Sequence, residues 1–209
     1  MTSEEFNNAL IERHGIEIYN KLKNSKAAIA GLGGLGSNVA IALARAGVGK
    51  LLLVDFDKVD ITNLNRQQYF IKDIGKAKTD ALSEIIREIN PVIELETINI
   101  NVTEENASKI FKDFGLVCEC FDRAENKAML INTLLTETEN TTVISATGMA
   151  GYGTSNTITT KKINDRLYIC GDRVSGIEQG LGLMAPRVGI CAMHQANMAL
   201  RFLLRIKEI

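Results

Sequence analysis

The sequence of 209 residues predicts an α/β fold: a Rossmann-like, largely parallel and doubly wound sheet with helices on both faces and an antiparallel C-terminal addition. Three observations lead to this prediction. Short apolar runs alternate with helical patterns over residues 28–146, which is typical of parallel strands joined by helices. A glycine-rich loop connects the first run to the first helix. After residue 148, two strand-like segments follow each other without a helix between them.

Residues 28–56 predict a strand, a glycine loop, a helix and a second strand. Gly31, Gly33 and Gly36 form the pattern G-x-G-x-x-G directly after an apolar run, and Asp55 follows about 20 residues later. Gly31 permits a tight turn, Gly33 lets the backbone approach a phosphate, and Gly36 lets the helix lie close to the strand. Amides at a helix start attract anions, and Asp55 is placed to hold ribose hydroxyls. The unit therefore predicts a nucleotide site, although the glycine pattern alone is also found in plain loops.

The remaining elements are predicted in order along a chain that we expect to form one domain, residues 1–209. Apolar spacing and turn residues define each of them. They are a helical arm (1–25), a helix opening at 74–79 and ending at residue 90, a strand (92–98), a helix (103–114), a strand (116–121), a helix (124–135), a strand (142–146), a glycine-rich loop with antiparallel strands (148–185, strands at 156–161 and 167–170) and a terminal helix (186–206).

A polar segment follows the second strand, over residues 55–67. It contains three acids, two asparagines, an arginine and a glutamine, and ligands bind at the carboxyl ends of strands in open α/β sheets. The guanidinium of Arg66 suits phosphate oxygens, whereas a solvated connection with an Asx turn is the simpler alternative. Lys76 and Lys78 stand at a helix start, where positive charge is unfavourable. They indicate a nearby anion or, alternatively, a surface lysine pair.

Composition excludes several classes of function. The chain carries 24 basic and 25 acidic residues, a net charge of −1, so no nucleic-acid partner is expected. Its four cysteines form no C-x-x-C pair, and we expect no zinc and a reduced, cytoplasmic protein with free thiols. The polar N-terminus predicts no signal peptide. Polar residues interrupt the apolar stretch at 188–204, so no membrane span is expected.

Three motifs carry a resemblance to a known family. They are Gly31-x-Gly33-Gly34-x-Gly36, the segment Asp55-x-Asp57-x-Val59-Asp60-x-x-Asn63-Leu64-x-Arg66-Gln67, and Gly75-x-x-Lys78. In this order and spacing they closely resemble the ThiF/MoeB/HesA family of ubiquitin-activating-enzyme-like adenylyltransferases. The segment 182–190 and Gln195-Ala196 also resemble that family. The resemblance covers roughly residues 12–205, and the short chain is similar to the compact ThiF-like branch of thiamine biosynthesis.

The resemblance implies an activity, a set of partners and a site. The family uses ATP and Mg²⁺ to adenylate the C-terminal glycine of a small β-grasp sulfur carrier protein that ends in Gly-Gly. For this chain the resemblance implies a ThiS-like carrier for thiamine thiazole biosynthesis, and it also implies a homodimer. By position, Arg66, Lys78 and Asp122 would be catalytic, with Asp122 near the magnesium. Arg13 matches an arginine that reaches the neighbouring subunit's ATP. The residues expected to bind nucleotide are Gly31, Gly33, Gly34, Gly36, Asp55, Asp57, Asn63, Arg66, Gln67, Lys78 and Asp122.

Departures from the family keep alternatives open. Arg123 stands where the family often has asparagine, and Lys127 stands near the position of an arginine. Cys170 lies near the region of zinc-binding or sulfur-handling cysteines in relatives, and it is either a sulfur-handling thiol or a structural one. The alternatives for function are adenylation of a molybdopterin-type carrier, an NAD-dependent oxidoreductase, and a non-catalytic nucleotide-binding subunit.

Overall fold

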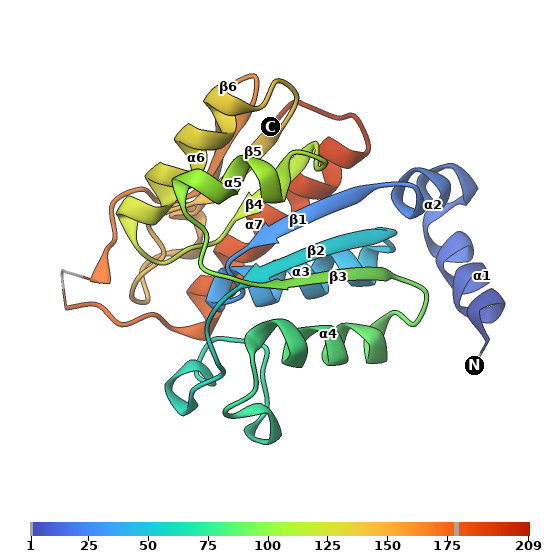
Figure 1. The fold of residues 1–209 in the computed structure, drawn as a ribbon, viewed down its shortest axis with the longest axis horizontal. Helices are drawn as coiled ribbons and strands as arrows, with labels where there is room; N and C mark the ends of the chain where they lie inside the picture. The colour runs from blue at the N-terminus through green and yellow to red at the C-terminus, as the bar shows by residue number, and fades with distance from the viewer. Residues whose placement is uncertain (1, 178–179) are drawn as a thin grey trace.

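A computed structural model describes residues 2–177 and 180–209 of the chain. Its centre is a sheet with strand order β3-β2-β1-β4-β5-β7-β6, in which neighbours are parallel except for β6 and β7 (Figure 1). The strands are β1 (Lys26–Ala30), β2 (Lys50–Asp55), β3 (Glu94–Asn99), β4 (Leu116–Glu119), β5 (Thr142–Ala146), β6 (Thr159–Asn164) and β7 (Leu167–Gly171). This topology confirms the predicted fold class, including the antiparallel addition.

Helices cover both faces of the sheet (Figure 1). Both faces need cover because successive side chains along each strand point to opposite faces. Ile29, Leu51 and Leu53 pack on one face with α3, α4 and α7, whereas Ala28 and Leu52 pack on the other face with α5 and α6. The helices are α1 (Ser3–His14), α2 (Ile16–Lys23), α3 (Gly34–Ala46), α4 (Lys78–Ile89), α5 (Glu104–Phe111), α6 (Ala124–Glu137) and α7 (Ala185–Leu203). Among the described residues, no helix is both long enough and apolar enough to cross a lipid bilayer.

The strand order reverses its direction between β1 and β4, which are neighbours although β2 and β3 lie between them in the chain. A crevice opens at such a switch point, outside the carboxyl ends of the strands. The loops that follow β1, β2, β4, β5 and β7 all leave the sheet at this edge. The arm formed by α1 and α2 leads into the amino end of β1 and lies at the opposite side (Figure 1).

Several element boundaries differ from the prediction by one to three residues, and the start of β6 has a clear local cause. Strand β6 begins at Thr159, three residues later than expected, because residues Ser155–Thr157 form a short 3₁₀ turn, η3. The Thr157 hydroxyl donates to the Thr154 carbonyl at 2.7 Å and closes this turn. The N-terminal arm is two helices because Gly15 has φ 79° and breaks the helix.

Candidate active site

The glycine loop joins β1 to α3 as a tight turn. Gly31 has φ 89°, which a side chain would strain. A Cβ atom at Gly36 would lie 1.8 Å from the Gly31 carbonyl oxygen, so the first turn of α3 rests directly on the loop. These two glycines therefore have the backbone roles that the sequence predicts for them.

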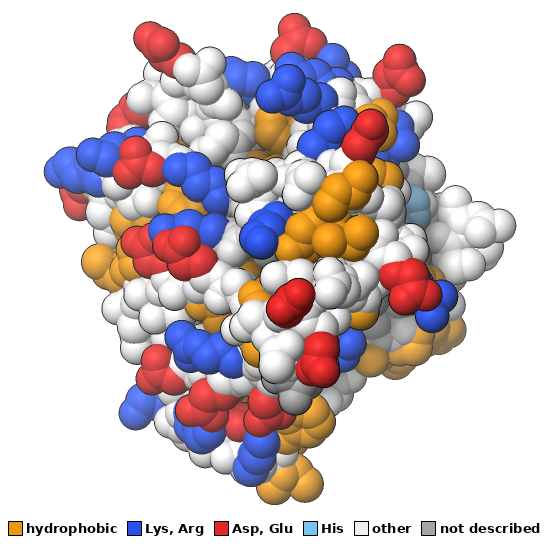
Figure 2. Space-filling model, turned by 90° about the vertical axis from the view of Figure 1, so that its right-hand side faces the viewer, with side chains coloured by type: hydrophobic (Ala, Val, Ile, Leu, Met, Phe, Trp, Pro, Cys, Tyr) orange, Lys and Arg blue, Asp and Glu red, His pale blue; other side chains and the backbone are white. Residues whose placement is uncertain are grey.

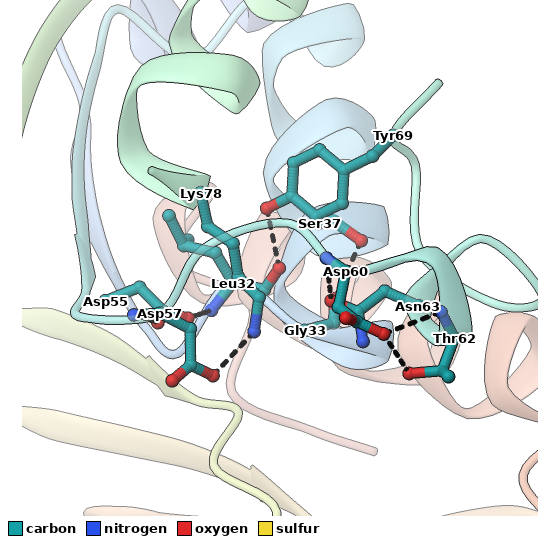
Figure 3. Close-up of polar contacts among 10 residues, drawn as sticks. All are labelled: Leu32, Gly33, Ser37, Asp55, Asp57, Asp60, Thr62, Asn63, Tyr69 and Lys78. Atoms are coloured by element: carbon teal, nitrogen blue, oxygen red, sulfur yellow. Dashed lines mark hydrogen bonds and ion pairs between the residues drawn. The ribbon is translucent and has the colours of Figure 1, made fainter. Parts of the chain in front are cut away.

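Asp55, the last residue of β2, braces this loop. Its Oδ2 accepts a hydrogen bond from the Leu32 amide at 2.6 Å, and its Oδ1 accepts one from the Asp57 amide at 2.8 Å (Figure 3). The Tyr69 hydroxyl donates to the Leu32 carbonyl at 2.8 Å from the other side. Burial raises the pKa of Asp55, whereas the charge of Lys78 and the two amides act in the opposite direction. Each carboxylate oxygen keeps acceptor capacity for a ligand hydroxyl.

Lys78 is the first residue of α4, and its side chain is buried. Its Nζ lies 2.7 Å from Oδ2 of Asp57, which explains how a cation is tolerated at a helix start (Figure 3). Lys76 differs, because it is partly exposed and pairs with Glu84 at 2.6 Å and with the buried Asp73 at 3.5 Å. Of the two lysines in the predicted pair, only Lys78 faces the site.

The loop between β2 and α4 places further polar groups beside the glycines. The side chain of Arg66 packs against Gly34, and its Nη1 donates to the Asn65 side chain at 2.8 Å. Asn63 ends the short 3₁₀ helix η1 (Ile61–Asn63), which Asp60 caps through the Thr62 amide and hydroxyl (Figure 3). Gln67 is buried, and among the described residues its Oε1 has no hydrogen-bond partner. This oxygen is therefore open to a hydrogen bond from a bound ligand or from water.

Asp122 lies in the loop after β4. The buried carboxylate of Glu119, the last residue of β4, holds this loop in place. The carboxylate of Glu119 accepts hydrogen bonds from Ser145 Oγ at 2.6 Å, from the Phe121 amide at 2.7 Å and from Lys127 Nζ at 3.0 and 3.1 Å. The charge of Lys127 is therefore already paired inside the protein. Asp122 is exposed, and no hydrogen bond or ion pair to its carboxylate is found among the described residues. Sequence reasoning missed Glu119, although an acid in an otherwise apolar strand was a usable signal.

These loops enclose a cavity of about 1120 Å³ at the carboxyl edge of the sheet. Cavities for small ligands usually measure about 300–1,000 Å³, so this one has room for a nucleotide and a segment of a second substrate. Gly36 lies below the cavity rather than in its wall. Ten of the predicted residues line it: Gly31, Gly33, Gly34, Asp55, Asp57, Asn63, Arg66, Gln67, Lys78 and Asp122.

Two predicted residues lie elsewhere. Arg13 belongs to α1, which has no buried residue and lies beyond the amino ends of the strands (Figure 1). It does not reach the cavity of its own chain, and its role toward a partner subunit stays a prediction. Cys170 is fully buried in β7 and is not part of the cavity wall. Burial raises the pKa of its thiol to about 11, which works against a sulfur-handling role.

Comparisons with known proteins agree with this architecture. The sequence model of the ThiF family matches residues 6–209. A molybdopterin-synthase adenylyltransferase of Haemophilus influenzae is 35% identical over 192 residues, which cover 89% of this chain and 77% of that protein. A tRNA threonylcarbamoyladenosine dehydratase of Bacillus subtilis is 45% identical over 111 residues, and this chain spans 42% of its length.

The fold is also that of a solved structure. The E. coli tRNA N6-threonylcarbamoyladenosine dehydratase TcdA in complex with ATP superposes with a TM-score of 0.84 at 22% identity, covering 95% of this chain and 93% of that one. The family model, the Haemophilus relative and the fold agree with the three motifs quoted above. The chain belongs to the ThiF family.

Proposed function

We propose that this protein is an ATP-dependent adenylyltransferase that activates the C-terminal glycine of a small β-grasp sulfur carrier protein, with a ThiS-like carrier of thiamine thiazole biosynthesis as its substrate. One observation carries the proposal: the glycine loop, Asp55, the cations Arg66 and Lys78, and the carboxylate of Asp122 all line one cavity. The Haemophilus relative, whose name states adenylyl transfer, supports this class of reaction.

The charges in the cavity suit this reaction. A carboxylate oxygen of the carrier would attack the α-phosphorus of ATP, forming an O–P bond while the bond to the leaving pyrophosphate breaks. Both reactants are anions, so fixed positive charge must offset their repulsion and stabilise the charge that develops. Arg66 lies against the glycine loop, and Lys78 lies at the start of α4, so the two cations approach the phosphate site from different elements.

Magnesium fits the same site. The ion usually binds through one or two carboxylates together with phosphate oxygens and waters. Asp122 is exposed in the cavity wall, and among the described residues its carboxylate is not used by any other group. When bound beside Asp122, the ion would neutralise phosphate charge.

The cavity rim favours a protein substrate. Ile100, Val174 and Ile177 line the cavity and yet are 39%, 77% and 62% exposed. Apolar side chains around an opening are typical of a protein contact. Two of the similar proteins are named for a reaction on tRNA, but the net charge of −1 disfavours a tRNA substrate here. Family membership likewise favours adenylyl transfer over an NAD-dependent oxidoreductase.

We also expect a cytoplasmic homodimer in which Arg13 reaches the partner's nucleotide. The face that carries α1 and α2 shows hydrophobic side chains gathered among charged ones (Figure 2). Ile16 and Ile18 of α2 are 53% and 41% exposed, which suits burial against a second copy. Sedimentation of the purified chain tests the dimer, and a monomer at all concentrations would contradict it.

ATP–pyrophosphate exchange tests the proposed function. The purified protein is given ATP, Mg²⁺ and, in separate reactions, a thiamine-type carrier, a molybdopterin-type carrier and unmodified tRNA. Exchange with the thiamine-type carrier alone is the expected result. Exchange with the molybdopterin-type carrier alone would keep the reaction and change the substrate. If ATP binds but no exchange occurs with any partner, the chain is a non-catalytic nucleotide-binding subunit.

A further inference from the structure

One wall of the cavity is built from two glycine-containing loops. Residues 147–150, after β5, and residues 173–177, after β7, line the cavity together with the glycine loop. The first loop continues through Gly151 and Gly153 to η3. Glycines let a bound chain approach the backbone closely, but they provide no packing of their own. Such a wall needs a brace from elsewhere in the fold.

Arg187, in the first turn of α7, makes four contacts with the segments that flank this wall. Its Nη1 donates to the carbonyl oxygens of Gly153 at 2.8 Å and Thr154 at 2.9 Å. Its Nη2 donates to the Thr157 hydroxyl at 3.1 Å and to Oδ2 of Asp172 at 2.5 Å. The residue is only 5% exposed, so this guanidinium is fixed inside the protein.

Asp172 links Arg187 to the second loop, the one that follows β7. Its Oδ1 accepts hydrogen bonds from the amides of Val174 at 2.8 Å and Ser175 at 2.9 Å. Burial raises the pKa of Asp172, but these hydrogen bonds and the one from Arg187 outweigh it and lower the pKa to about 2. The Asp172 amide also donates to the Gly148 carbonyl at 2.9 Å, which ties this loop to the first one.

The same turn of α7 touches the nucleotide side of the cavity. The Cγ1 atom of Val188 lies 3.1 Å from the position that a Cβ of Gly34 would take. Val188 lines the cavity, whereas Arg187 and Asp172 do not. Arg187 and Asp172 therefore do not reach a bound group themselves and act on the site through the segments that they hold.

We propose that the Arg187–Asp172 ion pair is a positioning device for the substrate wall, which sets the affinity for the protein substrate and leaves nucleotide binding unchanged. This inference rests on the proposed function for the identity of that substrate. The braced wall bears the exposed apolar residues Val174 and Ile177, whereas the nucleotide residues lie on the glycine loop and beside β2 and α4. If this wall were more mobile, the carrier tail would be oriented less well, whereas ATP would bind as before.

The test compares Arg187→Lys and Asp172→Asn with a matched control, Arg166→Lys. Arg166 also donates to two backbone carbonyls, those of Leu135 and Thr138, but it is not part of the cavity wall. In pyrophosphate exchange, we expect each wall variant to raise the carrier KM about tenfold, with kcat and the ATP Kd changed by less than about twofold. The control should change none of the three constants.

Two results would overturn the inference. One is an ATP Kd that rises in step with the carrier KM, because the ion pair would then support the whole fold. The other is a carrier KM that stays at the wild-type value in both wall variants. Hydrogen exchange gives a readout without activity: residues 148–157 and 172–177 should exchange faster in both wall variants, and residues 57–78 should not. If the wild-type protein activates no carrier, the proposed function is wrong. The positioning role is tested separately, because hydrogen exchange at the same rate in wild type and wall variants over these segments would refute it.

Discussion

The Nζ atom of Lys78 lies 2.7 Å from Oδ2 of Asp57, in an ion pair that joins a side chain 7% exposed to one 50% exposed. The lysine is thus held at the cavity wall by a carboxylate that solvent can reach. A triphosphate that enters the cavity would compete with Asp57 for the ammonium group, because both are anions that accept hydrogen bonds from it. The pair holds the buried ammonium in place before any substrate binds.

Replacing Lys78 by glutamine is expected to lower the exchange rate by about 100-fold or more, because the phosphates lose a fixed positive charge in a partly desolvated site. Steady-state exchange with purified variants measures this. Lys76→Gln is the matched control, since Lys76 lies two residues away, pairs with Glu84 and Asp73, and is not part of the cavity wall. Equal losses in the two variants would mean that Lys78 has no special role.

Asp122→Asn should lower exchange by about 100-fold and raise the Mg²⁺ concentration needed for half-maximal rate, while the Kd of ATP without metal changes little. A magnesium titration of the exchange reaction measures both effects. Glu125→Gln is the control, because Glu125 is exposed in the first turn of α6 and is not part of the cavity wall. An unchanged magnesium requirement in Asp122→Asn would remove Asp122 from the metal site.

Gly36→Ala tests the geometry of the glycine loop. Its new Cβ would lie 1.8 Å from the Gly31 carbonyl, so the helix must shift, and we expect a loss of about 3 kcal/mol or more in the free energy of unfolding. Gly189→Ala in α7 is the contrast, because its Cβ meets nothing within 4 Å and should stabilise the helix by about 0.5–1 kcal/mol. Urea unfolding compares them. A Gly36→Ala variant as stable as the wild type would contradict the packing described.

Lys127→Met should cost about 3 kcal/mol of stability, because it leaves the fully buried carboxylate of Glu119 without its charge partner. Urea unfolding measures the loss. Lys109→Met on the exposed surface of α5 is the control and should stay within about 0.5 kcal/mol of the wild type. Similar effects for the two variants would mean that the Glu119–Lys127 pair is not needed to keep the loop after β4 in place.

Cys170→Ala is expected to leave exchange activity unchanged, because the thiol is buried and its pKa is raised to about 11. In the folded protein this thiol stays protonated up to a pH of about 11, whereas in the unfolded chain it loses its proton above a pH of about 8.5. The free energy of unfolding should therefore fall as the pH rises from about 8.5 to 11. Maleimide labelling in the native state should be slow and should accelerate on unfolding. Fast native labelling together with loss of activity in the alanine variant would restore the sulfur-handling role.

The sequence predicted the parts of this site that depend on local backbone chemistry. Gly31 and Asp55 could be placed because a fixed spacing links a tight turn, a helix start and a strand end. Partners from different elements could not be placed in this way. Tertiary packing brings Glu119 of β4 to Lys127 of α6, and Arg187 of α7 to Asp172 after β7, so no periodicity indicates these pairs. The start of β6 was misplaced for a similar reason, because the turn at η3 depends on a side-chain hydrogen bond.

Adenylation of the carrier terminus itself tests the proposed reaction without relying on exchange kinetics. Purified protein, ATP and Mg²⁺ are mixed with a thiamine-type carrier ending in Gly-Gly or with the same carrier lacking its last glycine, and the carrier mass is recorded by mass spectrometry. We predict a carrier–AMP adduct with the complete carrier only, and its loss in Asp122→Asn. An adduct on the truncated carrier, or none on the complete carrier while ATP is bound, would contradict the central claim.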